Sequence, residues 1–380
     1  MKILLTGGGT GGHFYPLMVV AEELNKLSDE ERIVDLHLYY MSDTPYDPEL
    51  LEEQFIHYIP IISGKLRTTM NFKNIILNIQ SMIKTSFGIV GAIFKVFSLY
   101  PDVVISKGGY ASFPVLVAAK LLRIPTIIHE SDTVPGRVSR WSGKFAKRIA
   151  LSYPEAAQYF DEKKVSVTGQ PVRKTLTHPV RDGAKAFFEL PGDLPTIGIY
   201  AGSQGSRAIN DAVVSIVPEL IKKYQIIHQT GAADYDDVTT EVRIALGDDT
   251  HRTRYKAFKF LNNVQAKVFS GAVDIVVSRA GSSLFEIAAW GKPSIIIPYV
   301  YAHGDHQRKN AYHYARTGAA VVIEESNLTP SVLLGQIQQI LESADLYSAM
   351  SAHAKAFFAP DAGRKIAIEA LSIALSHVEE

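Results

Sequence analysis

The chain of 380 residues contains no cysteine. This absence excludes a disulfide framework, thiolate metal sites and cysteine nucleophiles, and it is typical of proteins in a reducing compartment. An excess of charge of either sign is also missing, because Lys and Arg together number 39 and Asp and Glu together number 39. The net charge therefore gives no indication of a nucleic-acid partner.

Long uninterrupted apolar runs are missing as well. At the N-terminus the apolar run Ile3–Leu5 is too short for a signal peptide, and a Gly-rich turn follows it. The most apolar stretch, Ile75–Leu99, is interrupted by the polar residues Asn78, Gln80, Lys84 and Lys95. We therefore predict neither a signal peptide nor a membrane-spanning helix, which makes the cytoplasm the default location.

Short apolar runs alternate with amphipathic stretches along the whole chain. The runs predicted to form strands are Lys2–Thr6, Asp35–Met41, Val103–Ser106, Thr126–His129, Arg148–Leu151, Lys164–Thr168, Thr196–Ala201, Gln225–Gln229, Tyr255–Phe258, Asp274–Ser278, Ser294–Pro298 and Ala319–Ile323. Helical periodicity fills most intervals, as in Pro16–Leu27, Phe113–Leu122, Ile209–Lys222 and Pro330–Leu341. This order predicts an α/β protein with parallel sheets and helices on both faces.

The length of 380 residues and one pause in the alternation predict two domains. The pause covers Gly169–Pro195, which is rich in Pro, Gly and charge and is interpreted as the linker. Each half begins with a strand, a Gly-rich turn and a helix, so we expect two Rossmann-like doubly wound domains facing each other across a cleft. The domains are expected over residues 1–170 and 171–350, with a final helix over 361–378 that packs back on the first domain.

Three Gly-rich turns follow predicted strands, at Thr6–His13, Lys107–Ser112 and Ala201–Ser206. Such a turn brings backbone N–H groups and a helix N-terminus close to an anion, although a tight turn without a ligand has the same pattern. The turns that open the two halves lack the spacing of a Walker loop or a dinucleotide-binding fingerprint, which disfavours a mononucleotide kinase and a dehydrogenase. Because open α/β sheets bind ligands at the carboxyl ends of their strands, we expect the turns to converge on one crevice.

Eight motifs, three of which overlap these turns, can be compared with known families. They are Gly8–His13, Gly108–Tyr110, His129–Glu130, Gly169–Arg173, Gly202–Arg207, Ser278–Gly281, Glu286–Ala289 and His306–Ala311. In this order, and over nearly the whole chain, the sequence resembles the MurG family of peptidoglycan N-acetylglucosaminyltransferases. The resemblance implies a GT-B fold and inverting transfer of N-acetylglucosamine from UDP-GlcNAc to lipid I, the membrane-anchored undecaprenyl-diphospho-muramoyl-pentapeptide. The product would be lipid II.

Two positions depart from the family pattern. A Ser-Asp pair ending in Asp132 stands where the family usually has Gln-Asn, so a carboxylate replaces an amide that both donates and accepts hydrogen bonds. The loop before Glu286 is one residue shorter than the common pattern. Family roles therefore transfer less directly to Ser282 and Ser283 than to Glu286.

The resemblance assigns donor binding to the second domain. Glu286 would accept hydrogen bonds from the ribose hydroxyls, or it is a carboxylate that complements a helix dipole. Ser203 would bind the diphosphate or only cap a helix, and Arg173 would neutralise the leaving UDP or form an interdomain salt bridge. Leu261 would meet the uracil through its backbone, or it is only a buried leucine. Gln307 would contact sugar hydroxyls, or it is an ordinary residue of a helix surface. The substrate-binding residues implied here are Arg173, Ser203, Leu261, Ser282, Ser283, Leu284, Phe285, Glu286 and Gln307.

His13 is the candidate general base, with Glu130 and Asp132 as alternatives. An imidazole titrates near neutral pH and can take the proton of an attacking sugar hydroxyl. Because His13 lies where a helix begins, the macrodipole is expected to favour its neutral form. The residues expected to form the floor under the reacting sugars are Thr10, Gly11 and Gly12.

Neither a metal site nor a cofactor is predicted. The histidines are scattered, and His303, His306 and His313 have only Asp305 as an acidic neighbour at ligand spacing. Amides, helix N-termini and arginine would then offset the charge of the phosphates.

The segment Phe72–Leu99 carries an unusually wide apolar surface. One stripe at helical spacing consists of Ile76, Ile79, Ile83, Phe87, Val90, Phe94 and Phe97. A second consists of Ile75, Met82, Ile89, Ile93 and Val96. With lysines among them and a basic run over 137–148, the stripes suit peripheral binding to the anionic cytoplasmic face of the cell membrane. A helix buried between two layers has the same pattern, and Gly88 and Gly91 are positions where the segment could divide.

Other functions remain open beside lipid I glycosylation. They are transfer of a UDP-sugar to another lipid such as diacylglycerol, epimerisation of UDP-GlcNAc on the same fold, and nucleotide-sugar binding without catalysis. An epimerase has no lipid acceptor, so it would leave the apolar segment without a purpose. The presence of His13, Arg173 and Glu286 argues against a scaffold that has lost catalysis.

Overall fold

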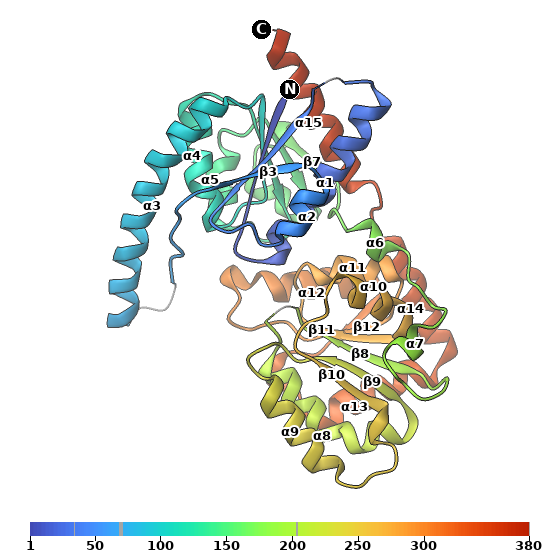
Figure 1. Ribbon diagram of the computed structural model, residues 1–380. Coiled ribbons are helices and arrows are strands. Elements are labelled where there is room, and N and C mark those ends of the chain that lie inside the picture. The colour runs from blue at the N-terminus through green and yellow to red at the C-terminus, as the bar shows by residue number, and fades with distance from the viewer. Residues whose placement is uncertain (34, 68–70, 203, 380) are drawn as a thin grey trace. The chain divides into compact units, whose positions relative to one another are not determined.

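The structure, a computed structural model, describes residues 1–33, 35–67, 71–202 and 204–379. The chain forms two units, each built on a parallel β-sheet (Figure 1). We call Met1–Arg173 with Ala359–Glu380 the N-terminal unit, and Lys174–Phe358 the C-terminal unit. The division between them falls inside the Pro- and Gly-rich segment 169–195.

The sheet of the N-terminal unit pairs seven of the described strands in parallel, in the order β3-β2-β1-β4-β5-β6-β7. The strands are β1 (Lys2–Thr6), β2 (His37–Ser42), β3 (Ile56–Pro60), β4 (Val103–Ser106), β5 (Thr126–Glu130), β6 (Arg148–Leu151) and β7 (Val165–Val167). The apolar run of β1 fits a strand that helices cover on both faces. Its side chains alternate between two cores, with Ile3 and Leu5 in one and Leu4 in the other.

Helices cover both faces of this sheet. In the described part of the unit they are α1 (Gly11–Glu30), α2 (Pro48–Glu53), α3 (Phe72–Leu99), α4 (Phe113–Leu121), α5 (Arg137–Gly143) and α15 (Ala362–Glu379), with 3₁₀ turns η1 (Tyr110–Ser112), η2 (Pro154–Tyr159) and η3 (Glu162–Lys164). The last helix, α15, packs along α1 at the end of the chain (Figure 1). Gly363 allows the close approach, because a Cβ there would lie 2.8 Å from Val19 Cγ1.

The C-terminal unit repeats this plan with six described strands in the order β10-β9-β8-β11-β12-β13. The strands are β8 (Thr196–Tyr200), β9 (Gln225–Gln229), β10 (Tyr255–Phe258), β11 (Ile275–Ser278), β12 (Ser294–Ile296) and β13 (Ala320–Val322). The helices are α6 (Lys174–Thr177), α7 (Ala184–Phe187), α8 (Arg207–Lys223), α9 (Tyr235–Leu246), α10 (Asn263–Ala272), α11 (Ser283–Trp290), α12 (His306–Arg316), α13 (Pro330–Glu342) and α14 (Ala344–Phe357), with η4 (Arg252–Arg254), η5 (His303–Asp305) and η6 (Glu325–Asn327). The prediction of two doubly wound parallel sheets is confirmed.

Each strand predicted from the sequence is present, with boundaries shifted by two residues or fewer. Strand β3 was not predicted; it is an edge strand in which apolar and polar residues are mixed, and it ends at Pro60. Edge strands tolerate both features, so the pattern lacks the apolar run of a central strand. Helix α1 begins at Gly11, five residues before the predicted start at Pro16, because the two glycines of its first turn carry little helical signal.

Helix α3 is continuous, and Gly88 and Gly91 do not divide it. Gly88 instead lies against the chain before the helix, where a Cβ would come within 1.8 Å of the Ile62 carbonyl oxygen. The residues buried on this face are Ser81, Gly88, Ala92 and Val96, of which Ser81 donates to the Lys65 carbonyl at 3.0 Å, and α3 also packs against α4. The alternative of a helix buried between two layers is wrong, because the opposite face is exposed.

The opposite face of α3 is exposed. All seven members of the first apolar stripe are exposed, including Phe87 at 70% and Phe94 at 71%. The second stripe is mixed, because Ile75 and Met82 are exposed whereas Ile93 packs on the core and Val96 is fully buried. The prediction that both stripes form the outer surface is thus correct only for the first stripe and part of the second.

Helix α3 also corrects the prediction that no segment is apolar enough to cross a bilayer. Among the described residues it is the one helix that is long and apolar enough to do so, by length and composition alone. The polar residues within it are few and widely spaced, so the average hydropathy of the helix remains high enough for a membrane span. Only 17% of its most apolar window is buried, which distinguishes it from a core helix.

Candidate functional site

The three Gly-rich turns lie at the topological switch points of the sheets. In the N-terminal unit the strand order reverses between β1 and β4, and the turns Gly7–Thr10 and Lys107–Gly109 follow these two strands. In the C-terminal unit it reverses between β8 and β11, which are followed by the turn 201–206 and the loop Arg279–Ser282. Open α/β sheets bind ligands at such points, where neighbouring loops separate.

The Gly-rich turn after β1 leads into α1, and His13 lies in the first helical turn of α1. The Thr10 hydroxyl and His13 Nδ1 are hydrogen-bonded at 2.9 Å, and the Thr10 carbonyl accepts the N–H of His13 at 3.0 Å. Gly109 has a φ of +81°, and a Cβ there would lie 3.4 Å from His13 Nε2. The glycine therefore lets the β4 turn lie against the imidazole. Gly11 is similarly close to Tyr46, whose hydroxyl would be 2.8 Å from an added Cβ.

His13 is neutral at neutral pH. Burial lowers the pKa of His13 to about 4, and the positive charge of Lys107 lowers it further, while Asp132 opposes the shift. The sequence analysis expected the neutral form but attributed it to the helix dipole. Burial and a neighbouring cation are the causes in the structure.

Lys107 is a buried cation that the sequence analysis quoted only as the start of a turn. Its side chain is 3% exposed, and its ammonium donates to the Ser131 hydroxyl at 2.8 Å. Burial lowers the pKa of Lys107, whereas the carboxylates of Glu130 and Asp132 raise it. The sequence did contain a signal for a buried lysine. Lys107 stands directly between a buried strand and two glycines, a position unlike that of a lysine on an exposed surface.

Glu130 organises the loop after β5. Its carboxylate accepts the N–H groups of Ser131 at 2.9 Å, Asp132 at 3.1 Å and Gly136 at 3.2 Å. Burial raises the pKa of Glu130, and the charge of Asp132 raises it further, while Lys107 lowers it. Since these amides occupy its oxygens, Glu130 is better suited to hold the loop than to act as a base.

Arg173, the last residue of the N-terminal unit, lies over the ring of Tyr15 in α1. The guanidinium carbon is 4.0 Å from the ring centroid, a distance at which cation–π attraction is effective. His129 supports the preceding segment, since its Nε2 lies 3.3 Å from the Gly169 carbonyl oxygen. The N-terminal unit therefore brings together His13, Lys107 and Asp132, which follow β1, β4 and β5. Arg173 packs against Tyr15 of α1.

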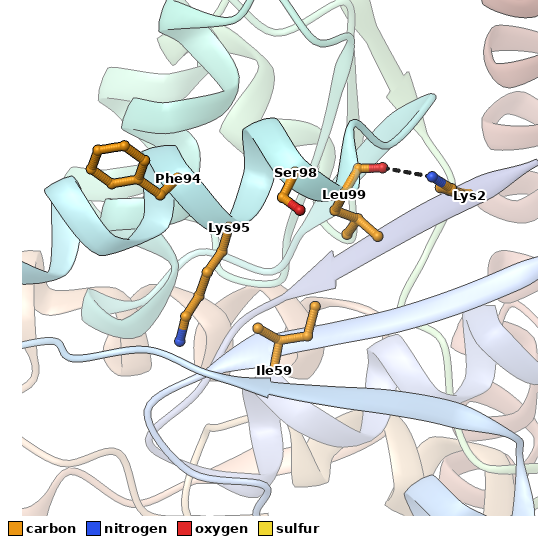
Figure 2. A pocket seen from close by; sticks show the side chains of 6 residues that line it. All are labelled: Lys2, Ile59, Phe94, Lys95, Ser98 and Leu99. Atoms are coloured by element: carbon orange, nitrogen blue, oxygen red, sulfur yellow. Dashed lines mark hydrogen bonds between the residues drawn. The ribbon is translucent and has the colours of Figure 1, made fainter.

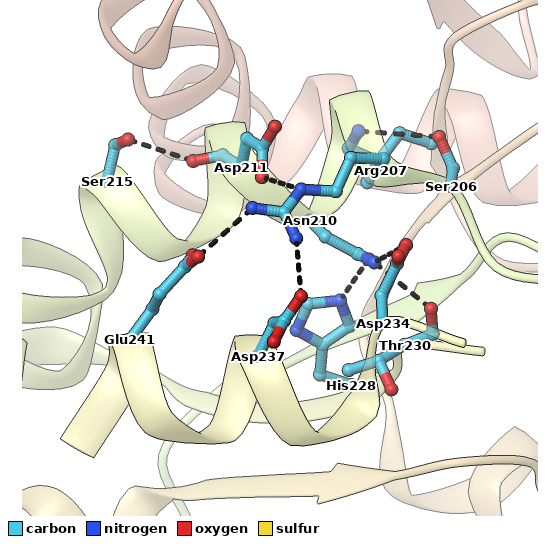
Figure 3. A network of polar contacts seen from close by, with 11 residues as sticks. Ser206, Arg207, Asn210, Asp211, Ser215, His228, Thr230, Asp234, Asp237 and Glu241 are labelled. Carbon is cyan, nitrogen blue, oxygen red and sulfur yellow. Dashed lines mark hydrogen bonds and ion pairs between the residues drawn. The ribbon is translucent and has the colours of Figure 1, made fainter. Parts of the chain in front are cut away.

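In the C-terminal unit a polar network holds the turn before α8 (Figure 3). Asn210 Oδ1 and His228 Nε2 are 3.0 Å apart, and Asn210 Nδ2 donates to the Thr230 carbonyl and to Asp234. Gly205 has a φ of +71° and packs so closely that a Cβ would lie 2.0 Å from the Thr230 carbonyl oxygen. Ser203, the predicted diphosphate ligand, lies outside the described residues.

Helix α11 carries Glu286 in its first turn, as predicted. Its carboxylate accepts a hydrogen bond from the Tyr200 hydroxyl at 2.9 Å. Ser282 and Ser283 are half-buried at the start of the helix, and the Ser283 hydroxyl lies 3.2 Å from that of Ser278.

The side chains of Leu284 and Phe285 point away from the helix start into the protein. Leu284 is fully buried in a core, and the Phe285 ring stacks on Phe357 with centroids 5.6 Å apart. Any contact of these two residues with a ligand would therefore use their backbone.

Leu261 and Gln307 are already engaged within the C-terminal unit. The Leu261 side chain is buried, and its N–H donates to Gln229 Oε1 at 2.9 Å. Gln229 in turn donates to the Gly202 carbonyl at 2.8 Å, which links Leu261 to the Gly-rich turn. Gln307 Oε1 accepts the N–H of Tyr299 at 3.0 Å, which leaves its amide nitrogen as the group that can donate to a sugar. In the part of the chain that the structure describes, no group of three or more metal-ligating side chains is assembled.

Comparison with known proteins identifies relatives of both units. Residues 3–151 match the glycosyltransferase family 28 N-terminal domain, and residues 196–366 match the glycosyltransferase family 28 C-terminal domain. A protein of Thermodesulfovibrio yellowstonii is 36% identical over 374 residues, which cover 96% of this chain and 97% of that protein. It is named UDP-N-acetylglucosamine–N-acetylmuramyl-(pentapeptide) pyrophosphoryl-undecaprenol N-acetylglucosamine transferase. The resemblance drawn from the motifs is confirmed.

Solved structures share the fold at lower identity. MurG of Acinetobacter baumannii is 24% identical, with 98% of this chain and 99% of that one covered and a TM-score of 0.70. A putative UDP-N-acetylglucosamine 2-epimerase from Listeria monocytogenes has the same TM-score at 15% identity, over 100% of this chain and 96% of that one. These likenesses confirm the predicted GT-B type of fold, but the fold alone does not separate a transferase from an epimerase.

Proposed function

The chain belongs to glycosyltransferase family 28, and from this premise we propose that it transfers N-acetylglucosamine from UDP-GlcNAc to undecaprenyl-diphospho-muramoyl-pentapeptide. The observation that carries the proposal is the 36% identity to a transferase of that name over nearly the full length of both chains. The epimerase is disfavoured because its likeness is limited to the fold, at 15% identity.

In the proposed reaction the N-terminal unit supplies the base. A sugar hydroxyl of the acceptor attacks the anomeric carbon of the donor while its proton passes to His13 Nε2. The new glycosidic C–O bond forms as the bond to the diphosphate breaks, with inversion, and UDP leaves with the electron pair. The hydrogen bond between Thr10 and His13 Nδ1 fixes the ring, and in the proposed reaction Nδ1–H donates to the Thr10 hydroxyl, which leaves the Nε2 lone pair to accept the proton. Arg173 is proposed to offset the charge of the departing UDP.

The decisive experiment is a direct assay of transfer. Purified protein is incubated with UDP-GlcNAc and a soluble lipid I analogue, and the products are separated by chromatography. We expect equal amounts of disaccharide product and UDP. Release of free UDP and a 2-epimer without disaccharide would identify the chain as an epimerase and refute the proposal.

Glu286→Ala is expected to weaken UDP binding about 10- to 100-fold. The reason is that ribose hydroxyls left without an acceptor cost about 1–3 kcal/mol. Isothermal titration with UDP measures the loss. Tyr200→Phe is the matched control, because it removes the hydrogen bond to Glu286 and keeps the carboxylate. Normal UDP affinity in a folded Glu286→Ala protein would leave Glu286 with a structural role only.

We further propose that α3 binds the N-terminal unit peripherally to the cytoplasmic face of the membrane. Its exposed apolar stripe faces away from α4, while its other face is held by the preceding chain through bonds such as Gly64 N–H to the Thr85 hydroxyl at 3.1 Å. Because that face is held, the helix is expected to lie on the bilayer surface and not to cross it. A pocket of about 420 Å³ lies at its C-terminal end and is lined by Lys2, Lys95 and Phe94 among others, with the Lys2 ammonium donating to the Leu99 carbonyl at 2.9 Å (Figure 2). Cations beside an apolar stripe suit anionic lipids.

The triple variant Ile79→Ser, Phe87→Ser, Phe94→Ser is expected to reduce binding to phosphatidylglycerol-containing vesicles more than about tenfold. The three side chains are 53%, 70% and 71% exposed, so their loss opens no core cavity. Vesicle co-sedimentation measures binding, and turnover of the soluble acceptor analogue should be retained. Ile244→Ser with Val264→Ser, at exposed positions of the C-terminal unit, is the control. Equal vesicle binding by the triple variant and the unmodified protein would exclude α3 as the membrane contact.

A further inference from the structure

The C-terminal unit has a pocket at the edge of its sheet opposite its Gly-rich turn. The pocket has a volume of about 620 Å³ and lies where β8 and β11 begin, next to Asp274 and Lys292. Asp274 donates its N–H to the Thr196 carbonyl at 2.7 Å, and its carboxylate accepts the Thr196 N–H at 2.8 Å. This geometry fixes the floor of the pocket. The residues proposed to bind the sugar donor UDP-GlcNAc lie near the carboxyl ends of the same strands, so this pocket is separate from them.

Lys292 is the unusual residue of this pocket. Its side chain is only 5% exposed, yet no hydrogen bond or ion pair joins its ammonium to another of the described residues. Asp274 attracts it, but Arg181, Lys185 and Lys355 repel it. A charge that is largely removed from water, with only Asp274 as an attracting neighbour, costs free energy of desolvation, which an anion bound in the pocket would offset.

The other lining residues favour an anion. Arg181 is exposed at the pocket and forms no ion pair with a described residue, whereas the Lys185 ammonium donates to the Leu194 carbonyl at 2.8 Å. Gly183 and Gly192 border the pocket with φ values of +72° and +73°, and a Cβ at either would meet no atom within 4 Å. The entrance is therefore open. Asp193 is the only carboxylate besides Asp274 among the lining residues, against three cations.

We propose that this pocket binds a small phosphorylated molecule, whose phosphate group pairs with Lys292 and Arg181. Phosphate supplies the several acceptor oxygens that an ammonium and a guanidinium can share. The volume exceeds that of a bare phosphate ion and lies in the range of small-molecule pockets, so a phosphate ester is the expected ligand. The proposal does not depend on the transfer reaction.

The test uses the full chain in a buffer free of phosphate and sulfate. Glycerol 3-phosphate, inorganic phosphate and neutral glycerol are titrated calorimetrically, and the pocket variants described below distinguish this pocket from a nucleotide site. We expect glycerol 3-phosphate to bind more tightly than inorganic phosphate, and glycerol not to bind. Tighter binding of inorganic phosphate would contradict the proposal that the ligand is a phosphate ester. If neither anion binds, the proposal of an anion site is wrong.

Variants locate the binding. Lys292→Met is expected to weaken glycerol 3-phosphate binding by about tenfold or more, because it removes a charged hydrogen-bond donor. Lys256→Met is the matched control, since Lys256 pairs with Glu189 at 3.0 Å elsewhere on the same unit. Arg181→Gln, at an exposed position, should also weaken binding, because the phosphate loses the guanidinium that pairs with it.

Thermal unfolding without ligand gives an independent measure. If the role of Lys292 is to bind an anion, the Lys292→Met protein should melt at a temperature at least as high as the unmodified protein. The reason is that the substitution removes a largely buried charge. A clearly lower melting temperature, or anion binding unaffected by both Lys292→Met and Arg181→Gln, would overturn the proposal. The lysine would then be a structural element and the anions would bind elsewhere.

Discussion

Replacement of His13 by alanine is expected to lower the rate of sugar transfer by about 10²- to 10⁴-fold, the range of a lost general base. UDP affinity should be nearly unchanged, because the proposed contacts with the uracil and the ribose belong to the C-terminal unit and His13 is not among the proposed UDP contacts. His13 fits this role because its Nδ1 is held by Thr10 at 2.9 Å and the ring is neutral. Single-turnover rates with the soluble acceptor analogue measure the loss.

The pH dependence of kcat/KM tests the same assignment. Since the pKa of His13 is lowered to about 4, the base form persists above that value and is lost below it. The acid limb of the profile should therefore lie near pH 4, well below the ordinary titration range of histidine. Asp132→Asn, which restores the usual family residue, is the control and should retain most activity. An inactive Asp132→Asn enzyme beside an active His13→Ala enzyme would transfer the role of base to Asp132.

The sequence predicted the central strands because each is an apolar run that two layers of helices cover. It missed β3, whose residues lie at the sheet edge and whose pattern is mixed. The sequence pattern also could not show which apolar residues of α3 are buried and which are exposed. Ile93 and Phe94 are neighbours of equal apolarity, yet only the fold decides that the first packs on the core and the second is exposed.

At the candidate site the sequence predicted positions better than environments. His13 and Glu286 lie in first turns of helices beside Gly-rich turns or strand ends, as expected. The cause of the neutral imidazole could not be predicted, because burial and the approach of Lys107 depend on how β1 and β4 pair. Glu130 also looks like a candidate base in the sequence, whereas the structure uses its oxygens to hold three backbone N–H groups.

Lys107→Met is expected to lower the free energy of unfolding by about 3 kcal/mol at neutral pH. The substitution removes a buried charged hydrogen bond to Ser131 and leaves the buried Glu130 carboxylate beside Asp132 without its cation. The pKa of Glu130, already raised above its ordinary value, should rise further. The folded state then binds a proton more tightly than the unfolded state does, so the stability defect should shrink as the pH falls through the raised pKa toward the unfolded value. Urea unfolding at several pH values measures this dependence.

Two variants separate an electrostatic role of Lys107 from simple packing. Lys163→Met, at an exposed position, should leave stability unchanged. Lys107→Met combined with Asp132→Asn should recover part of the loss, because it removes the negative charge that raises the pKa of Glu130. In the single variant the acid limb of transfer activity should also move above pH 4, since Lys107 no longer lowers the pKa of His13. A stability loss that is independent of pH and insensitive to Asp132→Asn, with an unmoved acid limb, would mean that Lys107 acts only by filling space between β4 and β5.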